Sequence, residues 1–188
     1  MALANQERAK RVLMESGLAD VWERNGCHVN LVDSLRMGLL TSHRDIDLHV
    51  YSKGITEESS FAIMAQIAKL PDATEIKCIN GLHTEEHYMT WHVFYRYDDE
   101  IWQFEVIHIE EGTEYEGSFE SIADRILEII TPTQKDTILR LKFETQFDKD
   151  YNGVENYEAM IANGIANMKD FEEWVTDHRK KPMYFWIS

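Results

Sequence analysis

Residues 45–52 constrain the fold of this chain most tightly. The run Asp-Ile-Asp-Leu-His-Val alternates polar and apolar side chains. Successive side chains of a β-strand point to opposite faces, so Asp45, Asp47 and His49 share one face, and the apolar residues between them share the other. The pattern predicts a half-buried strand whose apolar face lies on a core and whose opposite face carries two carboxylates side by side.

The rest of the first half predicts a mixed β-sheet with flanking helices. Helical spacing covers two segments, residues 3–25 with a break near Gly17 and residues 56–69, and a turn with a short helix is expected over residues 33–44. Strands are expected over residues 27–32, 74–79, 88–97 and 101–109, the last two forming a hairpin. The predicted fold class is α+β, a mixed α/β arrangement.

The second half changes to a helical pattern. Apolar residues recur at helical spacing over residues 118–130, and Thr131-Pro132-Thr133-Gln134 combines an N-cap, a proline at the first helical position and a capping-box glutamine. We predict helices over residues 118–130, 132–147, 152–168 and 169–179, and a strand in the tail at 183–187. The chain thus divides into an α/β core over residues 1–117 and a helical region over residues 118–188.

Composition narrows the choice of partners. The chain has 34 acidic against 19 basic residues and a formal net charge of −15. Because Lys and Arg are scattered along the chain, this charge disfavours extended nucleic acid. A small anion such as a nucleoside triphosphate remains compatible, since a divalent cation can bridge its phosphates to carboxylates.

The cysteines and the apolar runs indicate a cellular compartment. Cys27 and Cys78 form no paired metal or disulfide spacing, which is typical of a reducing cytosol. The apolar runs are far shorter than a membrane span, and the N-terminal segment interrupts them with charges. We therefore expect a cytoplasmic protein without a membrane partner.

The most informative motif lies in residues 32–50, with the sequence VDSLRMGLLTSHRDIDLHV. It resembles the signature of the nucleotidyltransferase superfamily, in which an apolar strand leads to Gly-Gly or Gly-Ser, a short helix follows, and Asp-apolar-Asp comes on the next strand. Ser34, Gly38, Asp45 and Asp47 match that pattern. The run His-Arg-Asp-Ile-Asp is most similar to small antibiotic nucleotidyltransferases of the lincosamide and aminoglycoside type, particularly those acting on lincosamides.

The resemblance implies metal-dependent chemistry. Asp45 and Asp47 would hold Mg²⁺ or Mn²⁺, ions that prefer hard oxygen ligands, while Ser34 would position the phosphates of ATP or another nucleoside triphosphate. The resemblance also requires a third carboxylate as metal ligand or general base. Glu105 is the candidate, because it interrupts a largely apolar strand. Some relatives have a histidine two residues beyond this acid, whereas His108 lies three beyond, which leaves the strand register and ligand identity open.

Several residues near the motif have two interpretations. Asp33 stands where the signature has glycine, and its side chain either crowds the triphosphate, points away or joins the metal site. Arg36 and Arg44 either bind nucleotide phosphates or pair with neighbouring acids. Lys135 and Lys142 lie seven apart on one helical face and either reach phosphate together or are solvated.

Histidines and aromatic residues offer weaker signals. His83 and His87 have helical i, i+4 spacing, with Cys78 and His92 nearby, but this segment is predicted to be a loop and matches no zinc motif. Four aromatic residues either stack on a base or an acceptor or pack in the sheet, and packing is the simpler interpretation. They are Tyr88, Trp91, Trp102 and Tyr115.

These observations lead to one hypothesis and two alternatives. The hypothesis is a metal-dependent nucleotidyltransferase that transfers a nucleoside monophosphate, expected to be AMP from ATP, to a hydroxyl of a small molecule. The resemblance suggests an antibiotic as this acceptor, with residues 118–188 lining the acceptor side of a catalytic core, and the acidic charge favours a cationic or neutral acceptor. One alternative is a protein of the same fold that binds nucleotide or a partner without turnover. The other is an unrelated α/β protein whose acidic face binds calcium or a protein.

Overall fold

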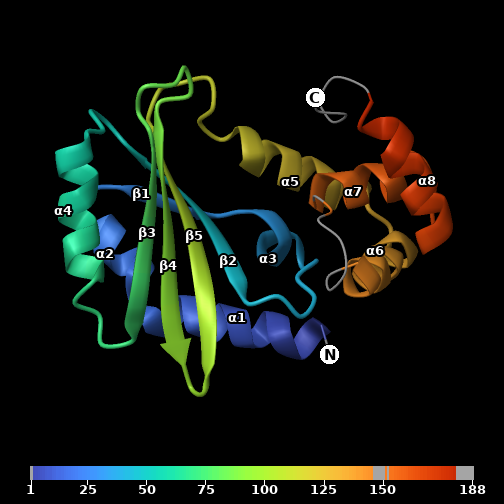
Figure 1. The fold of residues 1–188 in the computed structure, drawn as a ribbon, viewed down its shortest axis with the longest axis horizontal. Helices are drawn as coiled ribbons and strands as arrows, with labels where there is room; N and C mark the ends of the chain where they lie inside the picture. Colours follow the sequence, from blue (N-terminus) through green and yellow to red (C-terminus); the bar gives the residue numbers. More distant parts are fainter. Residues whose placement is uncertain (1, 146–150, 152, 181–188) are drawn as a thin grey trace.

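A five-stranded mixed sheet forms the centre of the molecule (Figure 1). The computed structural model describes residues 2–145, 151 and 153–180. The strands lie in the order β1-β2-β5-β4-β3, with β2 and β5 parallel and the other neighbouring pairs antiparallel. The predicted α+β fold class is confirmed. In chain order the elements are α1 (Ala2–Ser16), α2 (Leu18–Arg24), β1 (His28–Leu31), α3 (Asp33–Met37), β2 (Asp45–Ser52), α4 (Glu57–Ile67), β3 (Ala73–Gly81), β4 (Tyr88–Tyr97), β5 (Glu100–Glu110), α5 (Ser118–Ile129), α6 (Pro132–Thr145), α7 (Gly153–Ile161) and α8 (Met168–His178).

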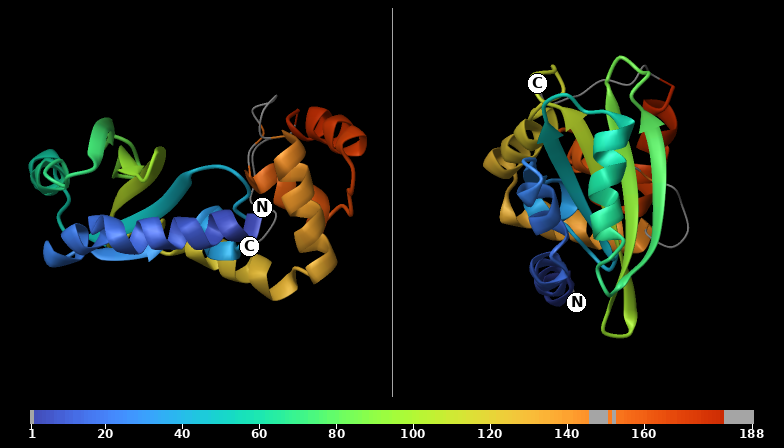
Figure 2. Two further views of the ribbon diagram at one scale, coloured as in Figure 1. Left: turned by 90° about the horizontal axis from the view of Figure 1, so that it is seen from below. Right: turned by 90° about the vertical axis from the view of Figure 1, so that its left-hand side faces the viewer.

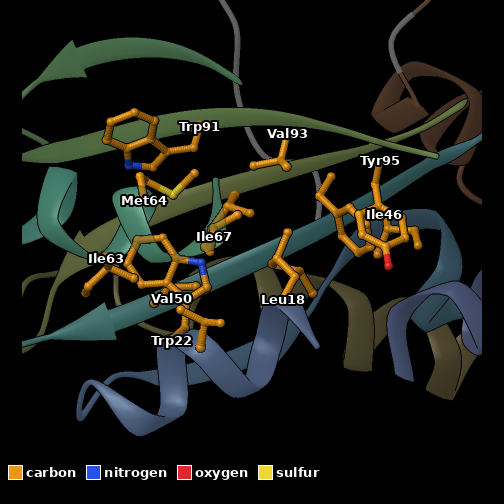
Figure 3. Packing of buried hydrophobic residues seen from close by; sticks show 14 of the residues in the cluster. Leu18, Trp22, Ile46, Val50, Ile63, Met64, Ile67, Trp91, Val93 and Tyr95 are labelled. Atoms are coloured by element: carbon orange, nitrogen blue, oxygen red, sulfur yellow. The ribbon is translucent and has the colours of Figure 1, made fainter. Parts of the chain in front are cut away.

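One face of the sheet is buried beneath α1, α2 and α4. Ile46, Leu48 and Val50 of β2 are at most 1% exposed, as the alternation predicts. Figure 3 shows Trp22 of α2 and Met64 of α4 among the side chains that pack with this face. Because a fully buried aliphatic or aromatic side chain stabilises a fold by roughly 1.5–3 kcal/mol, this layer fixes which face of β2 points outward. Asp45 and Asp47 therefore lie on the opposite face.

The C-terminal helices gather beyond α3 at one end of the molecule (Figures 1 and 2). Met37, the last residue of α3, and Leu39, two residues later, are buried in the same cluster as residues of α5, α6 and α7. At the start of α5, the buried carboxylate of Glu120 accepts hydrogen bonds from the Tyr51 hydroxyl at 2.9 Å and from the Asn30 amide at 2.9 Å. These contacts hold the helical half against β1, β2 and α3. A division of the chain at residue 117 stays a prediction.

Most predicted boundaries hold to within a few residues, but the predicted end of the helix over residues 152–168 is wrong. Helix α7 ends at Ile161, because Gly164 adopts a left-handed conformation with φ of +65° and the Ile165 N–H bonds back to the Ala159 carbonyl. Asn167 then caps α8 by accepting the Asp170 N–H at 3.0 Å. Apolar residues recur at helical spacing through this segment, but Gly164 and Asn167 encode a break between α7 and α8.

Local signals explain the start of α6. The Gln134 N–H donates to the Thr131 hydroxyl at 3.3 Å, and the Gln134 side chain accepts the Thr131 N–H at 2.9 Å, which forms the predicted capping box. The predicted end of this helix beyond residue 145 and the predicted tail strand at 183–187 lie outside the described residues. Within the described part of the chain, no helix combines the length and apolar character needed to cross a membrane.

Candidate active site

The predicted acidic side chains lie on neighbouring parallel strands. Asp47 of β2 is the register partner of Glu105 of β5, and Asp45 pairs with Gln103. Residues in register on adjacent strands project to the same face, so Glu105 lies beside the row formed by Asp45 and Asp47. The structure thus places Glu105 on the neighbouring strand and the face expected for a third carboxylate.

Burial and mutual repulsion perturb these carboxylates. The pKa of Asp47 lies well above its usual value, because burial first, and then the negative charges of Asp33, Asp45 and Glu105, disfavour the ionised form. Burial also raises the pKa of Asp45, against the opposing influence of nearby positive charge. Lys142 lowers both values and is the cation common to the two aspartates. Because these carboxylates repel one another, a bound cation would stabilise their ionised forms.

Ser34 lies in the first turn of α3, shortly after the end of β1, and this position brings it next to the row of acidic side chains. Ser34 is buried, and its Oγ accepts a hydrogen bond from the Lys142 Nζ at 2.7 Å. The same ammonium donates to the Tyr157 hydroxyl at 3.1 Å, and the Ser34 and Tyr157 oxygens lie 3.3 Å apart. Burial lowers the pKa of Lys142, whereas Asp33, Asp45 and Asp47 favour its charged form. A serine from α3 and a lysine from α6 therefore converge beside the aspartates.

Asp33 keeps the backbone conformation that suits glycine. Its φ is +48°, in the left-handed region that glycine adopts freely and aspartate tolerates better than most residues. The Asp33 Oδ1 accepts a hydrogen bond from the Tyr157 hydroxyl at 3.3 Å. The turn is therefore preserved, and the extra carboxylate points toward Tyr157 and adds its charge to the acidic row.

Gly38 also has a conformational role. It ends α3 with φ of +66°, and a Cβ at this position would lie 2.7 Å from the Lys135 Nζ. Its carbonyl accepts a hydrogen bond from the Gln6 amide at 3.0 Å. This glycine turns the chain from α3 toward β2 and leaves room for α6.

Arg36 and Arg44 form ion pairs. Arg36 holds the exposed Asp124 of α5 through two nitrogens, at 2.6 and 3.2 Å, and Arg44 lies 2.6 Å from Glu100 at the start of β5. These contacts correspond to the interpretation as pairs with neighbouring acids. Nucleotide binding by either arginine stays a prediction. Lys135 donates to the Met37 carbonyl at 3.4 Å, so of the two α6 lysines it is Lys142 whose charge reaches the aspartates.

The histidines divide between the two faces of the sheet. His108, an odd number of residues from Glu105, lies in the core, where it bonds to Ser52 at 2.7 Å and Ser60 at 3.1 Å. His92 of β4 is instead the register partner of Glu105, with its Nδ1 3.8 Å from a carboxylate oxygen. The alternation of β5 therefore removes His108 from the acidic face and brings His92 there.

The acidic row suits a cation that it shares with phosphates. Within residues 2–145, 151 and 153–180, no group of three His, Cys, Asp or Glu side chains is already placed to hold a metal ion. Mg²⁺, however, commonly uses one or two carboxylates together with substrate phosphates, without a cage made only of protein ligands. Asp45 and Asp47 supply such hard oxygen donors, and Glu105 stands in register beside them. The residues fit a metal ion that arrives with a triphosphate.

Lys142 and Tyr157 are candidate site residues that lie outside the sequence motif. Lys142 was one of two lysines on a helical face, and Tyr157 carried no motif. The only available signal was a lysine and a tyrosine at buried positions of amphipathic helices, since polar groups there need partners. Their contacts with Ser34 are distant in the sequence, since Lys142 is 108 positions and Tyr157 is 123 positions away from it.

Solved structures share this architecture. A crystal structure of the Cid1 poly(U) polymerase with MgGTP bound aligns over 77% of this chain and 44% of its own, with 12% identity and a TM-score of 0.52. A structure of the same polymerase with Mg 3′-dATP bound aligns over 76% of this chain and 44% of its own, with 13% identity and a TM-score of 0.53. The sequence matches no protein-family model and no curated protein.

These similarities establish the class of fold. The chain has the nucleotidyltransferase fold and spans less than half the length of the polymerase chains that it matches. This finding argues against an unrelated α/β protein. The narrower resemblance to antibiotic-modifying enzymes gains no support from these structures and stays a prediction.

Proposed function

We propose that this protein is a metal-dependent nucleotidyltransferase that moves a nucleoside monophosphate, AMP from ATP, to a hydroxyl of a small molecule. The observation that carries this proposal is the register of β2 and β5, which aligns Glu105 with Asp47 beside Asp45. Ser34 and Lys142 converge beside these carboxylates, and in this proposal they bind the phosphates of the nucleotide. The fold shared with two nucleotide-bound polymerase structures supports it.

The proposed reaction is an in-line displacement at the α-phosphorus. The acceptor hydroxyl oxygen forms a new bond to the α-phosphorus, while the bond from that phosphorus to the oxygen bridging to the β-phosphate breaks, and pyrophosphate leaves. The hydroxyl proton passes to the Glu105 carboxylate or through it to water. A divalent ion held by Asp45 and Asp47 would supply Lewis-acid stabilisation of the phosphate charge.

The other residues position the nucleotide in this proposal. Ser34 donates a hydrogen bond to a phosphate oxygen, and the Lys142 ammonium, now bonded to Ser34 and Tyr157, offers its donors to the phosphates as a point charge. Because both groups are buried, their hydrogen bonds to phosphate are stronger than they would be in water. Positioning of this kind is a large part of catalysis in phosphoryl transfer.

The acceptor is the finer part of the proposal. The structural neighbours are poly(U) polymerases by name, yet this chain carries a net charge of −15. Such a charge repels polyanions and attracts amines, although at physiological salt the effect is screened beyond roughly 8 Å. We therefore place a small cationic or neutral hydroxylated molecule, of the kind found among antibiotics, ahead of RNA.

A direct assay tests the proposal. The protein is incubated with MgATP and a panel of lincosamides, aminoglycosides, sugar phosphates and short RNA, and both pyrophosphate release and acceptor mass are followed. We expect one small-molecule class to gain the mass of AMP. Asp47→Asn should lower turnover by more than about 100-fold without unfolding the protein, whereas Asp99→Asn in the exposed β4–β5 turn should not. Transfer to RNA alone would refute the small-molecule acceptor.

A second candidate function follows from Asp33. Its carboxylate adds to the charges that raise the pKa of Asp47 and accepts a bond from Tyr157, so it stands where a triphosphate would approach. A protein with this arrangement can bind a nucleotide with its metal and fail to turn it over. MgATP binding without pyrophosphate release, across the whole acceptor panel, would favour this candidate.

A further inference from the structure

A cavity of about 1050 Å³ lies on the open face of the sheet, next to the acidic row. Its floor comes from β4 and β5, one wall comes from α5, and the loops before β4 and after β5 form the rim. Figure 1 shows α5 leading away from β5 toward the C-terminal helices.

The cavity begins one side chain beyond the proposed catalytic residues. His49 is two positions past Asp47 on the same face of β2, and Ile107 is two positions past Glu105 on β5. Two residues of a strand span about 7 Å. A molecule seated in the cavity can therefore extend a hydroxyl to Asp47 and Glu105, while the phosphate side lies toward Ser34 on α3.

The chemistry of the lining is apolar with a few hydroxyls. Isoleucine, phenylalanine and tyrosine side chains make up most of the floor and wall, and Phe119 is 43% exposed although it is large and apolar. Thr90, Ser118 and Ser121 add hydroxyl groups. A concave apolar surface with a small number of polar groups is typical of small-molecule sites, and its volume suits a ligand of several hundred daltons.

Charge at the rim selects against a polyanion. Glu86 and Glu114 line the cavity, while its arginine, Arg125, lies 3.4 Å from Glu128 in an ion pair. The pKa of the Tyr115 hydroxyl is raised by burial and then by the negative charges of Glu114 and Glu86. RNA binding relies on cations that contact phosphates, and this rim presents carboxylates. A protonated amine is the complementary group.

The wall of the cavity is held rigidly against the sheet. The Tyr51 hydroxyl shares its one proton between the two oxygens of the buried Glu120 carboxylate, at 2.9 and 3.1 Å, and the Asn30 amide donates a second hydrogen bond to the same carboxylate. The His49 ring packs edge-on against Phe119 with centroids 5.0 Å apart. A preformed wall lowers the ordering cost of binding a ligand.

We propose that this cavity is the acceptor site and that the acceptor is an amphipathic amine: an apolar body that fills the cavity, a basic nitrogen near Glu86 and Glu114, and a hydroxyl directed at Asp47 and Glu105. The inference rests on the proposed function for the role of the hydroxyl. The chemical class of the ligand is inferred from the side chains that line the cavity.

Three matched indole alcohols test the inference. Tryptophanol carries an ammonium, tryptophol is neutral and indole-3-lactate is anionic, and all three combine an indole body with a hydroxyl. Saturation-transfer NMR with the full chain should rank their binding in that order, with at least about a tenfold difference in Kd between the amine and the acid. No binding of the amine, or equal binding of the acid, would overturn the proposal.

Variants on α5 locate the binding. Ser121→Trp projects into the cavity from an exposed position and should weaken tryptophanol binding by about tenfold or more, whereas Leu127→Trp, on the same helix outside the lining, should not. Far-UV circular dichroism checks the fold of both variants. Equal effects of the two variants, or displacement of tryptophanol by MgATP or by a short oligouridine, would contradict an acceptor site here. Thermal stabilisation by MgATP, measured separately, reports the nucleotide side and distinguishes failure of the proposed function from failure of this inference.

Discussion

Replacement of Lys142 by methionine tests the nucleotide side of the site most sharply. The Lys142 ammonium is buried, lies 2.7 Å from the Ser34 Oγ, and is the cation that influences both Asp45 and Asp47. Methionine keeps most of the length and the apolar contacts of the stem while removing the charge. We expect Lys142→Met to fold and to bind MgATP much more weakly than the wild type.

The contacts set the magnitude. A hydrogen bond that involves a charged group contributes about 1.5–3 kcal/mol, and each 1.36 kcal/mol is a factor of ten, so the Kd for a non-hydrolysable MgATP analogue should rise by about 10- to 150-fold. Isothermal titration calorimetry gives this value directly. Lys135→Met is the matched control, because Lys135 lies seven residues earlier on α6 and contacts the Met37 carbonyl at 3.4 Å.

Two results would refute this reasoning. A Kd of Lys142→Met within about threefold of the wild type, below the 1.5 kcal/mol expected of a charged hydrogen bond, would remove Lys142 from the nucleotide site. An equal loss in Lys135→Met would point to a general effect of net charge, since both variants remove one positive charge. Circular dichroism of both variants identifies any loss that arises from unfolding.

Three further predictions concern the metal, the signature turn and the core. Saturating MgATP should stabilise the protein by about 2.7 kcal/mol at 100 times its Kd, and excess chelator should abolish most of the thermal shift, so a shift indifferent to metal would contradict the acidic site. Asp33→Gly should tolerate the φ of +48° and tighten MgATP binding by up to about fivefold; unchanged or weaker binding would argue that this carboxylate does not face the triphosphate. Burial among Ser52, Ser60 and Trp22 lowers the pKa of His108 from 6.5 to about 4. As the pH falls from 6.5 to 4, the unfolded chain therefore gains a proton that the folded chain does not. The free energy of unfolding should fall by about 3 kcal/mol over this range. Urea unfolding at both pH values should show this loss in the wild type and a smaller one in His108→Gln, and identical pH slopes would refute the assignment.

The sheet was predictable because its signals are local. The alternation in β2 fixes which residues face the core, and the capping box at Thr131 fixes the start of α6, each within a few residues of sequence. The same alternation places His108 opposite to Glu105, which the spacing of three residues already implies. The end of α7 does not follow from apolar periodicity, because that periodicity continues past Ile161 and the stop is encoded by Gly164 and Asn167.

The candidate site was predictable only where it lies on one strand or its neighbour. Asp45, Asp47 and Ser34 belong to a single short motif, and Glu105 was found as an acid in an apolar strand. Lys142 and Tyr157 depend on how α6 and α7 dock against α3, which is set by side-chain packing between segments more than a hundred residues apart. Periodicity identifies the buried face of such a helix without identifying what that face contacts.

The electrostatics of the acidic row imply an order of events in the proposed reaction. Asp33, Asp45 and Glu105 all raise the pKa of Asp47, and Lys142 is the cation that opposes them. A bare triphosphate would add several negative charges to this group, whereas a triphosphate with its metal brings positive charge to the aspartates and phosphate oxygens to Lys142. The nucleotide and metal should therefore bind together, and the acceptor should meet a site whose repulsion has already been relieved. A free amine binds the cavity without metal on this argument, but its hydroxyl reaches a phosphorus only after the metal–nucleotide complex is in place.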